Sequence, residues 1–177
     1  MEIRDYNGEG PWGRDALLAR YQDYCRRFSV ERPFDLSPLE TTQENVKWIY
    51  PVMQKVIKGI EAGDKACIEI GVEFIHEDCG FPFGRILKAN TARALRRAAL
   101  SDLQIERVRS RIVDLLIAGN VPREYREYSK LLRKIGIGSR WEYLEANVDT
   151  SNQFAKRHYE IFRKAFRTEL SARVGAS

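Results

Sequence analysis

Four side chains capable of metal binding or acid–base chemistry lie on one predicted helix, over residues 64–77. Glu69, Glu73, His76 and Glu77 fall on one broad face of it, because residues three and four apart share a side of a helix. Carboxylate and imidazole groups so placed bind divalent metals or transfer protons. The pattern predicts either a metal-dependent active site or, as the plainer interpretation, a solvated acidic face.

The Glu73-x-x-His76 spacing resembles a ligand pair of the di-iron carboxylate proteins. Those proteins use the motif twice and add a glutamate from each of two further helices. The only other histidine is His158, and the residue three positions before it is Ala155. Half of the pattern is therefore missing, and we predict no metal site, no cofactor and no catalytic residue.

The three cysteines, Cys25, Cys67 and Cys79, show no Cys-x-x-Cys spacing. Cys25 and Cys67 occupy apolar helical positions, which is typical of buried thiols. A Cys–His nucleophile pair forms in space, so the sequence leaves it open. We expect these thiols to be reduced. The N-terminus has no apolar leader, and no apolar run approaches the ~20 residues of a membrane span. The sequence therefore predicts a cytoplasmic protein without a membrane segment.

The charge of the chain changes sign part-way along it. Residues 1–83 carry 10 lysines and arginines against 15 acidic residues, a net charge of −5. Residues 84–140 carry 14 against 5, a net charge of +9, and 11 of the 14 are arginine. A basic block of this kind favours a polyanionic partner, and arginine binds phosphate in a bidentate fork.

Two predicted helices, 85–99 and 122–135, place these cations opposite an apolar face. A cationic stripe can follow a phosphate backbone and release its counterions, although any surface helix also carries a charged face. The residues that we predict to contact phosphate are Arg85, Lys88, Arg93, Arg96, Arg97, Arg123, Arg126, Lys130, Arg133, Lys134 and Arg140.

Aromatic residues gather in two loops and on the last helix. The segments Tyr6–Trp12 and Phe81–Phe83 hold rings among turn residues; they either cover the core or form a stacking site for unpaired bases or a partner. The predicted helix 151–172 has an aromatic face that either docks on the bundle or binds a partner.

Helical periodicity dominates the elements that must position these residues, and no stretch shows sustained strand-like alternation. Residues 1–13, with Gly8, Gly10, Pro11 and Gly13, predict an irregular arm. The remaining predicted helices run over residues 14–29, 42–61 with Pro51 kinking it, 102–118, and a short segment around Trp141.

The helix pairs 64–77 with 85–99 and 102–118 with 122–135 resemble the antiparallel pairs of HEAT-like α-helical repeats. The text Ile86-Leu-Lys-Ala-Asn-Thr-Ala-Arg-Ala-Leu-Arg-Arg97 is similar to the second helix of such a repeat. We predict one all-α domain over residues 1–177 with six to eight helices in antiparallel pairs and a helix-pair core over 64–135. It is either a helical bundle or a short HEAT-like solenoid.

These observations favour a non-enzymatic nucleic-acid-binding protein. A helical adaptor that binds another protein or a second copy is the first alternative, because an acidic first half and a basic middle can pair head-to-tail. A metal-dependent helical enzyme using Glu73 and His76 is the second.

Overall fold

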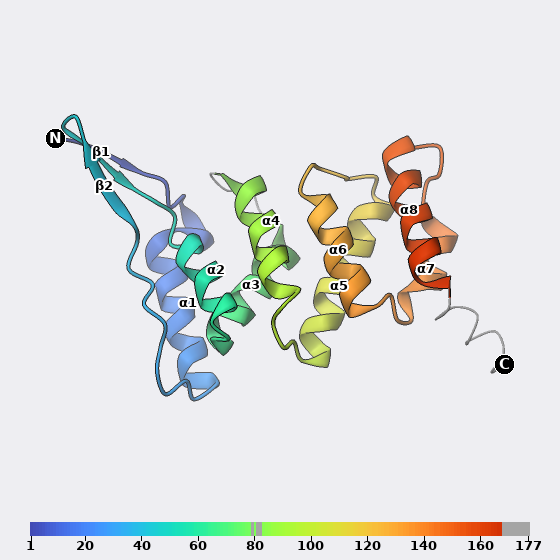
Figure 1. Cartoon of the computed structure of the whole chain (residues 1–177), viewed down its shortest axis with the longest axis horizontal. Helices are drawn as coiled ribbons and strands as arrows, with labels where there is room; N and C mark the ends of the chain where they lie inside the picture. Colours follow the sequence, from blue (N-terminus) through green and yellow to red (C-terminus); the bar gives the residue numbers. More distant parts are fainter. Residues whose placement is uncertain (79, 81–82, 168–177) are drawn as a thin grey trace. The chain divides into compact units, whose positions relative to one another are not determined.

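The computed structural model describes residues 1–78, 80 and 83–167, and its internal contacts divide the chain into two units, Met1–Leu100 and Ser101–Ser177 (Figure 1). Within those described residues the chain forms eight α-helices and one small three-stranded sheet. The prediction of a mostly helical protein with six to eight helices is therefore confirmed. The prediction of one domain over 1–177 stays a prediction, and each unit is described in turn.

The first unit is built around α3, which packs against three other helices of the unit. Residues Ala66–Val72 of α3 are all buried, and a helix that is apolar nearly all round belongs inside a fold. Asp64 caps it by accepting a hydrogen bond from the Cys67 amide at 2.7 Å. The helices of this unit are α1 (Arg14–Arg27), α2 (Met53–Glu61), α3 (Lys65–Glu77) and α4 (Gly84–Leu95).

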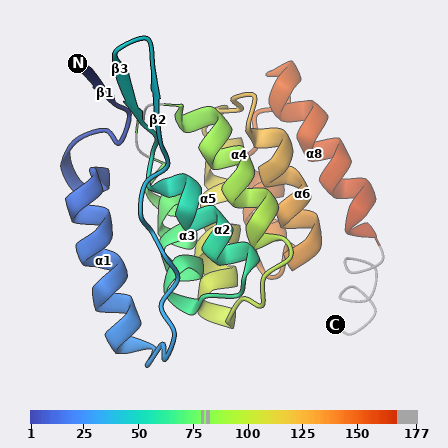
Figure 2. The ribbon, with the colours of Figure 1, turned by 60° about the vertical axis from the view of Figure 1, so that its left-hand side comes forward.

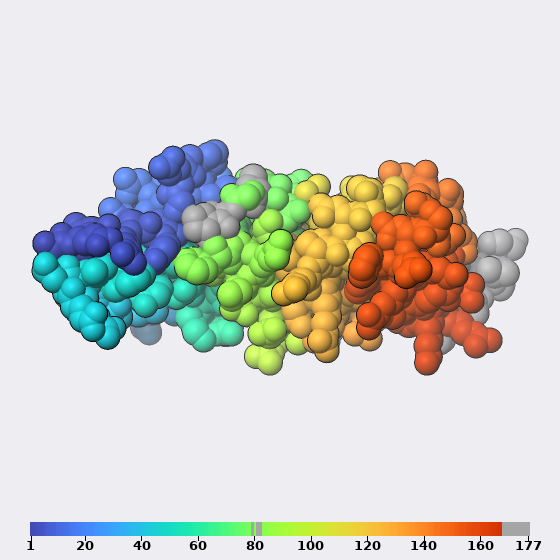
Figure 3. All heavy atoms as spheres, turned by 90° about the horizontal axis from the view of Figure 1, so that it is seen from above, coloured from blue at the N-terminus to red at the C-terminus, as the bar shows by residue number. Residues whose placement is uncertain are grey.

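The same unit contains a sheet of three short strands, β1 (Glu2–Asp5), β2 (Glu40–Gln43) and β3 (Val46–Ile49). β3 lies between the other two, parallel to β1 and antiparallel to β2 (Figure 2). Figure 3 shows the dark blue β1 lying along the cyan β2–β3 hairpin. Glu44 and Asn45 form the hairpin turn, both with positive φ (49° and 65°), which matches the twist of a two-residue hairpin loop.

The predicted helix over 42–61 is wrong in its first half, where the chain forms this hairpin instead. Strands form here instead of a helix because these residues favour β-structure and pair across strands. They are the β-branched Thr41, Thr42 and Val46 and the aromatic Trp48. Pro51 does not kink a helix but precedes the start of α2.

The expected irregular arm over 1–13 also contains regular structure, namely β1 and a single 3-10 turn at Gly10–Trp12. Asn7 ties this arm to the chain before α2. Its Oδ1 accepts the Val52 amide at 2.7 Å, and its Nδ2 donates to the Tyr50 carbonyl at 3.4 Å. The buried Asn7 side-chain amide therefore adds hydrogen bonds beyond the few backbone bonds that four-residue strands can form.

The second unit is centred on α5, which contacts the unit's three other helices. A capping box begins α5, with Ser101 and Gln104 each bonding the other's backbone amide. The Tyr125 hydroxyl donates to the Ile112 carbonyl at 2.8 Å inside the core. The helices are α5 (Asp102–Ile117), α6 (Tyr125–Ile135), α7 (Arg140–Asn147) and α8 (Gln153–Ala165). Residues 168–172 of the predicted last helix lie outside the described residues.

The four helices that make up the proposed repeat pairs are all present. α3 packs on α4 within the first unit, and α5 packs on α6 within the second. Among the helices that the structure describes, none is long and apolar enough to span a bilayer.

The close approach of α2 to α3 requires glycine at position 59. A Cβ there would overlap the Cys67 Sγ and lie 2.9 Å from its Cβ. We expect Gly59→Ala to lower the free energy of unfolding, because overpacking costs roughly 1–3 kcal/mol and outweighs the ~1 kcal/mol that alanine gains over glycine inside a helix. Chemical denaturation measures the change.

The double variant Gly59→Ala/Cys67→Ala provides the control, since it removes the overlapping sulfur. It should regain part of the stability that Gly59→Ala loses relative to the matching background. A Gly59→Ala protein as stable as the wild type would contradict the tight α2–α3 packing.

Candidate functional site

The acidic face of α3 is covered by α1 and by the 3-10 turn before it. The Glu73 carboxylate accepts hydrogen bonds from the Tyr24 hydroxyl and, at 2.9 Å, from Arg20 Nη1. The indole N–H of Trp12 donates to Glu77 Oε2 at 2.6 Å. The Arg20 guanidinium also lies over the Trp12 ring, 4.4 Å from its centroid. These contacts hold α1 and the N-terminal arm against α3.

This geometry corrects the plainer interpretation of that face as solvated for Glu69 and Glu73, while Glu77 stays exposed. The Glu73 side chain keeps only 16% of its exposure, and burial together with Glu73 raises the pKa of Tyr24 well above its usual value. His76 is exposed. Among the described side chains, no group of three or more histidine, cysteine, aspartate or glutamate residues could hold a metal ion.

The described cysteines are placed for packing rather than for nucleophilic chemistry. Cys67 is buried and Cys25 half-buried. Burial raises the pKa of both thiols, and the thiolate is the reactive form. Cys79 lies outside the described residues.

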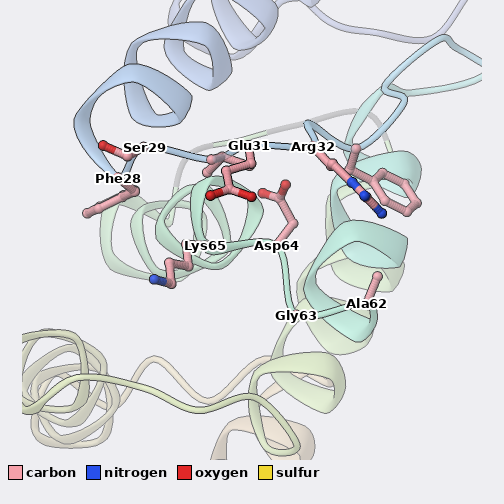
Figure 4. Close-up of a pocket in the computed structure, with 10 residues that line it drawn as sticks. Phe28, Ser29, Glu31, Arg32, Ala62, Gly63, Asp64 and Lys65 are labelled. Atoms are coloured by element: carbon pink, nitrogen blue, oxygen red, sulfur yellow. The ribbon is translucent and has the colours of Figure 1, made fainter.

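A pocket of about 440 Å³ lies in the first unit between the loop after α1 and the α2–α3 turn (Figure 4). It is lined by side chains of both charges, including Glu31, Arg32, Asp64 and Lys65. The Asp64 carboxylate is occupied, because Oδ1 caps α3 and Oδ2 accepts the Tyr21 hydroxyl at 3.0 Å. Its bonds serve the fold, and the pocket shows no arrangement that would carry out a reaction.

The basic residues predicted on α4 divide into exposed and buried ones. Arg85, Arg93 and Arg97 are exposed, and Arg96 is half-buried. Lys88 is buried, with its ammonium 2.6 Å from the Asp78 carboxylate. The α4 face therefore offers arginines to solvent while its one lysine fastens α4 to the end of α3.

A groove of about 420 Å³ runs beside these arginines, between α2 and α4. Arg93 lines it together with two amide side chains, Gln54 and Asn90. Lys58, also in the lining, binds Glu61 at 2.9 Å. The groove thus combines a guanidinium with amides that both donate and accept hydrogen bonds.

The α6 face in the second unit is strongly basic. Its exposed cations are Arg126, Arg133 and Lys134, and Arg123 is exposed just before the helix begins. The two acidic residues of the same segment, Glu124 and Glu127, are only 7% and 8% exposed. Lys130 is half-buried and donates to Glu127 Oε1 at 2.7 Å. The outward charge of this helix is therefore more positive than its sequence composition.

Arg140 has a structural contact that its sequence position does not reveal. It donates to Asp114 of α5 at 2.7 Å and lies over the Tyr143 ring, 4.7 Å from its centroid. Of the eleven predicted phosphate contacts, Lys88, Lys130 and Arg140 are thus bound to carboxylates. The exposed ones form two sets, on α4 in the first unit and on α6 in the second.

The last helix confirms the expected docking of an aromatic face. Tyr159 and Phe162 of α8 are buried, and Tyr159 stacks on Trp141 with centroids 5.6 Å apart. His158 meets the Tyr125 ring edge-on at 4.8 Å. Phe154 remains 71% exposed. The basic side that the sequence places opposite this aromatic face is exposed, at Lys156, Arg157, Arg163, Lys164 and Arg167.

Comparison with protein-family models, with curated proteins and with solved structures gives no match. The resemblance of residues 64–135 to HEAT-like repeats therefore stays a prediction. The function of the two basic surfaces has to be inferred from their own charges and contacts.

The position of Lys88 yields a test of its structural role. We expect Lys88→Gln to lower the free energy of unfolding by about 3 kcal/mol, because a buried carboxylate at Asp78 loses its cation. Arg85→Gln, on the exposed side of the same helix, should change it by less than about 0.5 kcal/mol. Equal stabilities of the two variants in urea denaturation would contradict the assignment.

The partly buried His158 should make the stability of the second unit depend on pH. Burial lowers its pKa, and the charge on Arg157 acts in the same direction. The unfolded chain therefore binds this proton first, and stability should fall as the pH drops through about 6.5 towards the lower folded value. Urea denaturation at pH 7.5 and 5.5 measures it.

His158→Phe keeps a ring against Tyr125 and removes the titrating group, so it should flatten this part of the pH dependence. His76→Gln changes an exposed histidine and should keep the wild-type dependence. A His158→Phe protein with the full wild-type slope would refute the role of His158.

Proposed function

We propose that this protein is a non-enzymatic nucleic-acid-binding protein that contacts phosphates through the exposed arginines of α6 and α4. The observation that carries the proposal is the surface of α6. Over residues 123–135, four cations face solvent, while both acidic residues are buried. A surface of one sign attracts a polyanion.

On three other surface helices, a cation pairs with an acidic residue of the same helix. Arg26 of α1 pairs with Asp23, Lys58 of α2 with Glu61, and Arg163 of α8 with Glu160 at 3.5 Å. Among the described residues, Arg126 and Arg133 have no acidic partner. The contrast separates α6 from an ordinary charged face, which is the competing interpretation.

The spacing of the α6 cations also favours an external anion. Within α6, Arg126 and Lys130 are four residues apart, and so are Lys130 and Lys134. Like charges so spaced destabilise a helix by roughly 0.2–0.5 kcal/mol per pair. Bound phosphates would relieve this repulsion and release counterions, so binding should weaken steeply with salt.

The α4 face supplies a second set of contacts with different chemistry. Arg85, Arg93 and Arg97 offer guanidinium groups, which bind phosphate through two parallel hydrogen bonds. Gln54 lines the groove beside Arg93 and offers an amide to a sugar or a base edge. Asn90 Oδ1 accepts from Arg93 Nη1 at 3.2 Å, so the Asn90 amide holds Arg93 in place. Lys88 is excluded from our set of contacts because it is buried against Asp78.

The test is a fluorescence-anisotropy titration of labelled DNA and RNA, single- and double-stranded, at two or more salt concentrations. We expect binding that falls with salt. Arg126→Gln/Arg133→Gln should weaken it and lower the slope of log Kobs against log salt by roughly 1.4 on a single strand, at about 0.7 for each lost phosphate contact.

Arg26→Gln/Arg27→Gln is the matched control, because it removes the same charge from two exposed arginines of α1. It should keep the wild-type slope. An equal loss in both double variants would show that net charge alone drives binding. No binding at low salt would refute the proposal.

A helical adaptor that binds another protein is the second candidate. The exposed apolar residues Phe154 and Leu103 of the second unit, at 71% and 68%, favour it. Concentration-dependent assembly in sedimentation experiments, with no affinity for nucleic acid, would support the adaptor.

A further inference from the structure

Three aromatic rings from distant parts of the chain meet in the first unit. Tyr6 follows β1, Trp48 lies on β3, and Phe83 immediately precedes α4. Tyr6 stacks on Trp48 with centroids 5.8 Å apart, and Phe83 meets Tyr6 edge-on at 5.1 Å. We call these three residues the aromatic cluster.

The aromatic cluster is partly open to solvent, unlike the groups around the other two tryptophans. Phe83 is 52% exposed, and Tyr6 and Trp48 are half-buried. The other tryptophans, Trp12 and Trp141, are only 4% and 6% exposed. Large rings are normally buried for their hydrophobic gain, so the core does not account for this cluster.

The backbone holds the Phe83 ring in this exposed position. Phe83 has φ 56° and ψ 17°, a left-handed conformation that is an outlier for a bulky residue. Strain of this kind persists where the surrounding structure over-determines it, and it concentrates at binding sites.

Positive charge borders the aromatic cluster on two sides. The Arg4 guanidinium lies over the Trp48 ring, 4.8 Å from its centroid, and forms an ion pair with the Glu2 carboxylate at 2.6 Å. Arg85 is exposed in the first turn of α4, two positions after Phe83. Phe83 provides no side-chain cap to α4, whose positive dipole end lies beside the ring. Rings and cations together match a ligand with flat apolar faces and negative charge.

We propose that the aromatic cluster is a base-stacking platform and that the nucleic acid bound by this protein is single-stranded. An unpaired base stacks on the exposed face of Phe83, and its phosphate lies towards Arg85 and the start of α4. Bases in a duplex are stacked on each other and offer no free face, so the platform discriminates against double strands. This inference rests on the proposed function and specifies a single-stranded nucleic acid as the ligand.

The decisive experiment compares Phe83→Ala with Phe154→Ala, which truncates an exposed phenylalanine in the second unit. A labelled thymidine oligonucleotide and a duplex with the same number of phosphates are titrated against each protein. Phe83→Ala should weaken single-strand binding by about fivefold or more and leave duplex binding unchanged. Phe154→Ala should change neither.

Two further measurements guard against a folding defect. Phe83→Leu keeps apolar bulk without a ring, and it should lose single-strand affinity while melting like the wild type. The intrinsic fluorescence should be quenched when the oligonucleotide binds, because Trp48 is the accessible tryptophan. Trp48→Phe should keep most of the affinity and lose the quenching.

The outcomes separate the platform from the proposed function. If Arg126→Gln/Arg133→Gln weakens binding but Phe83→Ala does not, the basic surface stands and the platform is refuted. Equal losses for single strand and duplex, quenching that persists in Trp48→Phe, or binding only of a proline-rich peptide would also refute it. If the wild-type protein binds no nucleic acid at low salt, both proposals fail.

Discussion

The Glu73 carboxylate of α3 can be withdrawn from water because other side chains donate hydrogen bonds to it. Tyr24 and Arg20 satisfy Glu73, and Trp12 satisfies Glu77. A carboxylate buried without such partners would be strongly unfavourable. Because its donors come from residues 12–24, this network fixes α1 and the arm before it. β1 is thereby carried against β3, and Tyr6 reaches Trp48. The aromatic cluster therefore depends on the hydrogen-bond and ion-pair network that holds the N-terminal arm against α3.

Acidic side chains are also buried in the second unit, and their burial leaves its surface more positive. Glu124 and Glu127 of the α6 segment are buried, so their charge is withdrawn from the outer face. The cations on that face then meet solvent without acidic neighbours on their own helix. On α8, by contrast, Glu160 remains outside beside Arg163. What a partner meets is the exposed charge, and burial separates it from the charge that the composition records.

Helical periodicity predicted α3, α5 and α6 well, because each has an apolar stripe and clear end signals such as Asp64 and Ser101. It failed at residues 40–49, where four-residue strands are too short to show alternation and the turn at Glu44-Asn45 lacks glycine. The candidate metal residues were found by spacing, yet Glu73 is occupied by donors from α1, 49 and 53 positions away. Spacing within one helix carries no information about such partners.

Local sequence was sufficient for the helices, for the apolar and basic sides of each, and for the excess of positive charge over residues 84–140. These properties follow from neighbours three and four positions apart, which share a helix face. The tertiary structure decided which cations are available. Lys88 is buried against Asp78 and Arg140 is held by Asp114, while Arg126 and Arg133 stay exposed. It also assembled Tyr6, Trp48 and Phe83 into one cluster. The physical reason is that burial and pairing depend on groups distant along the chain, which only folding brings within contact distance.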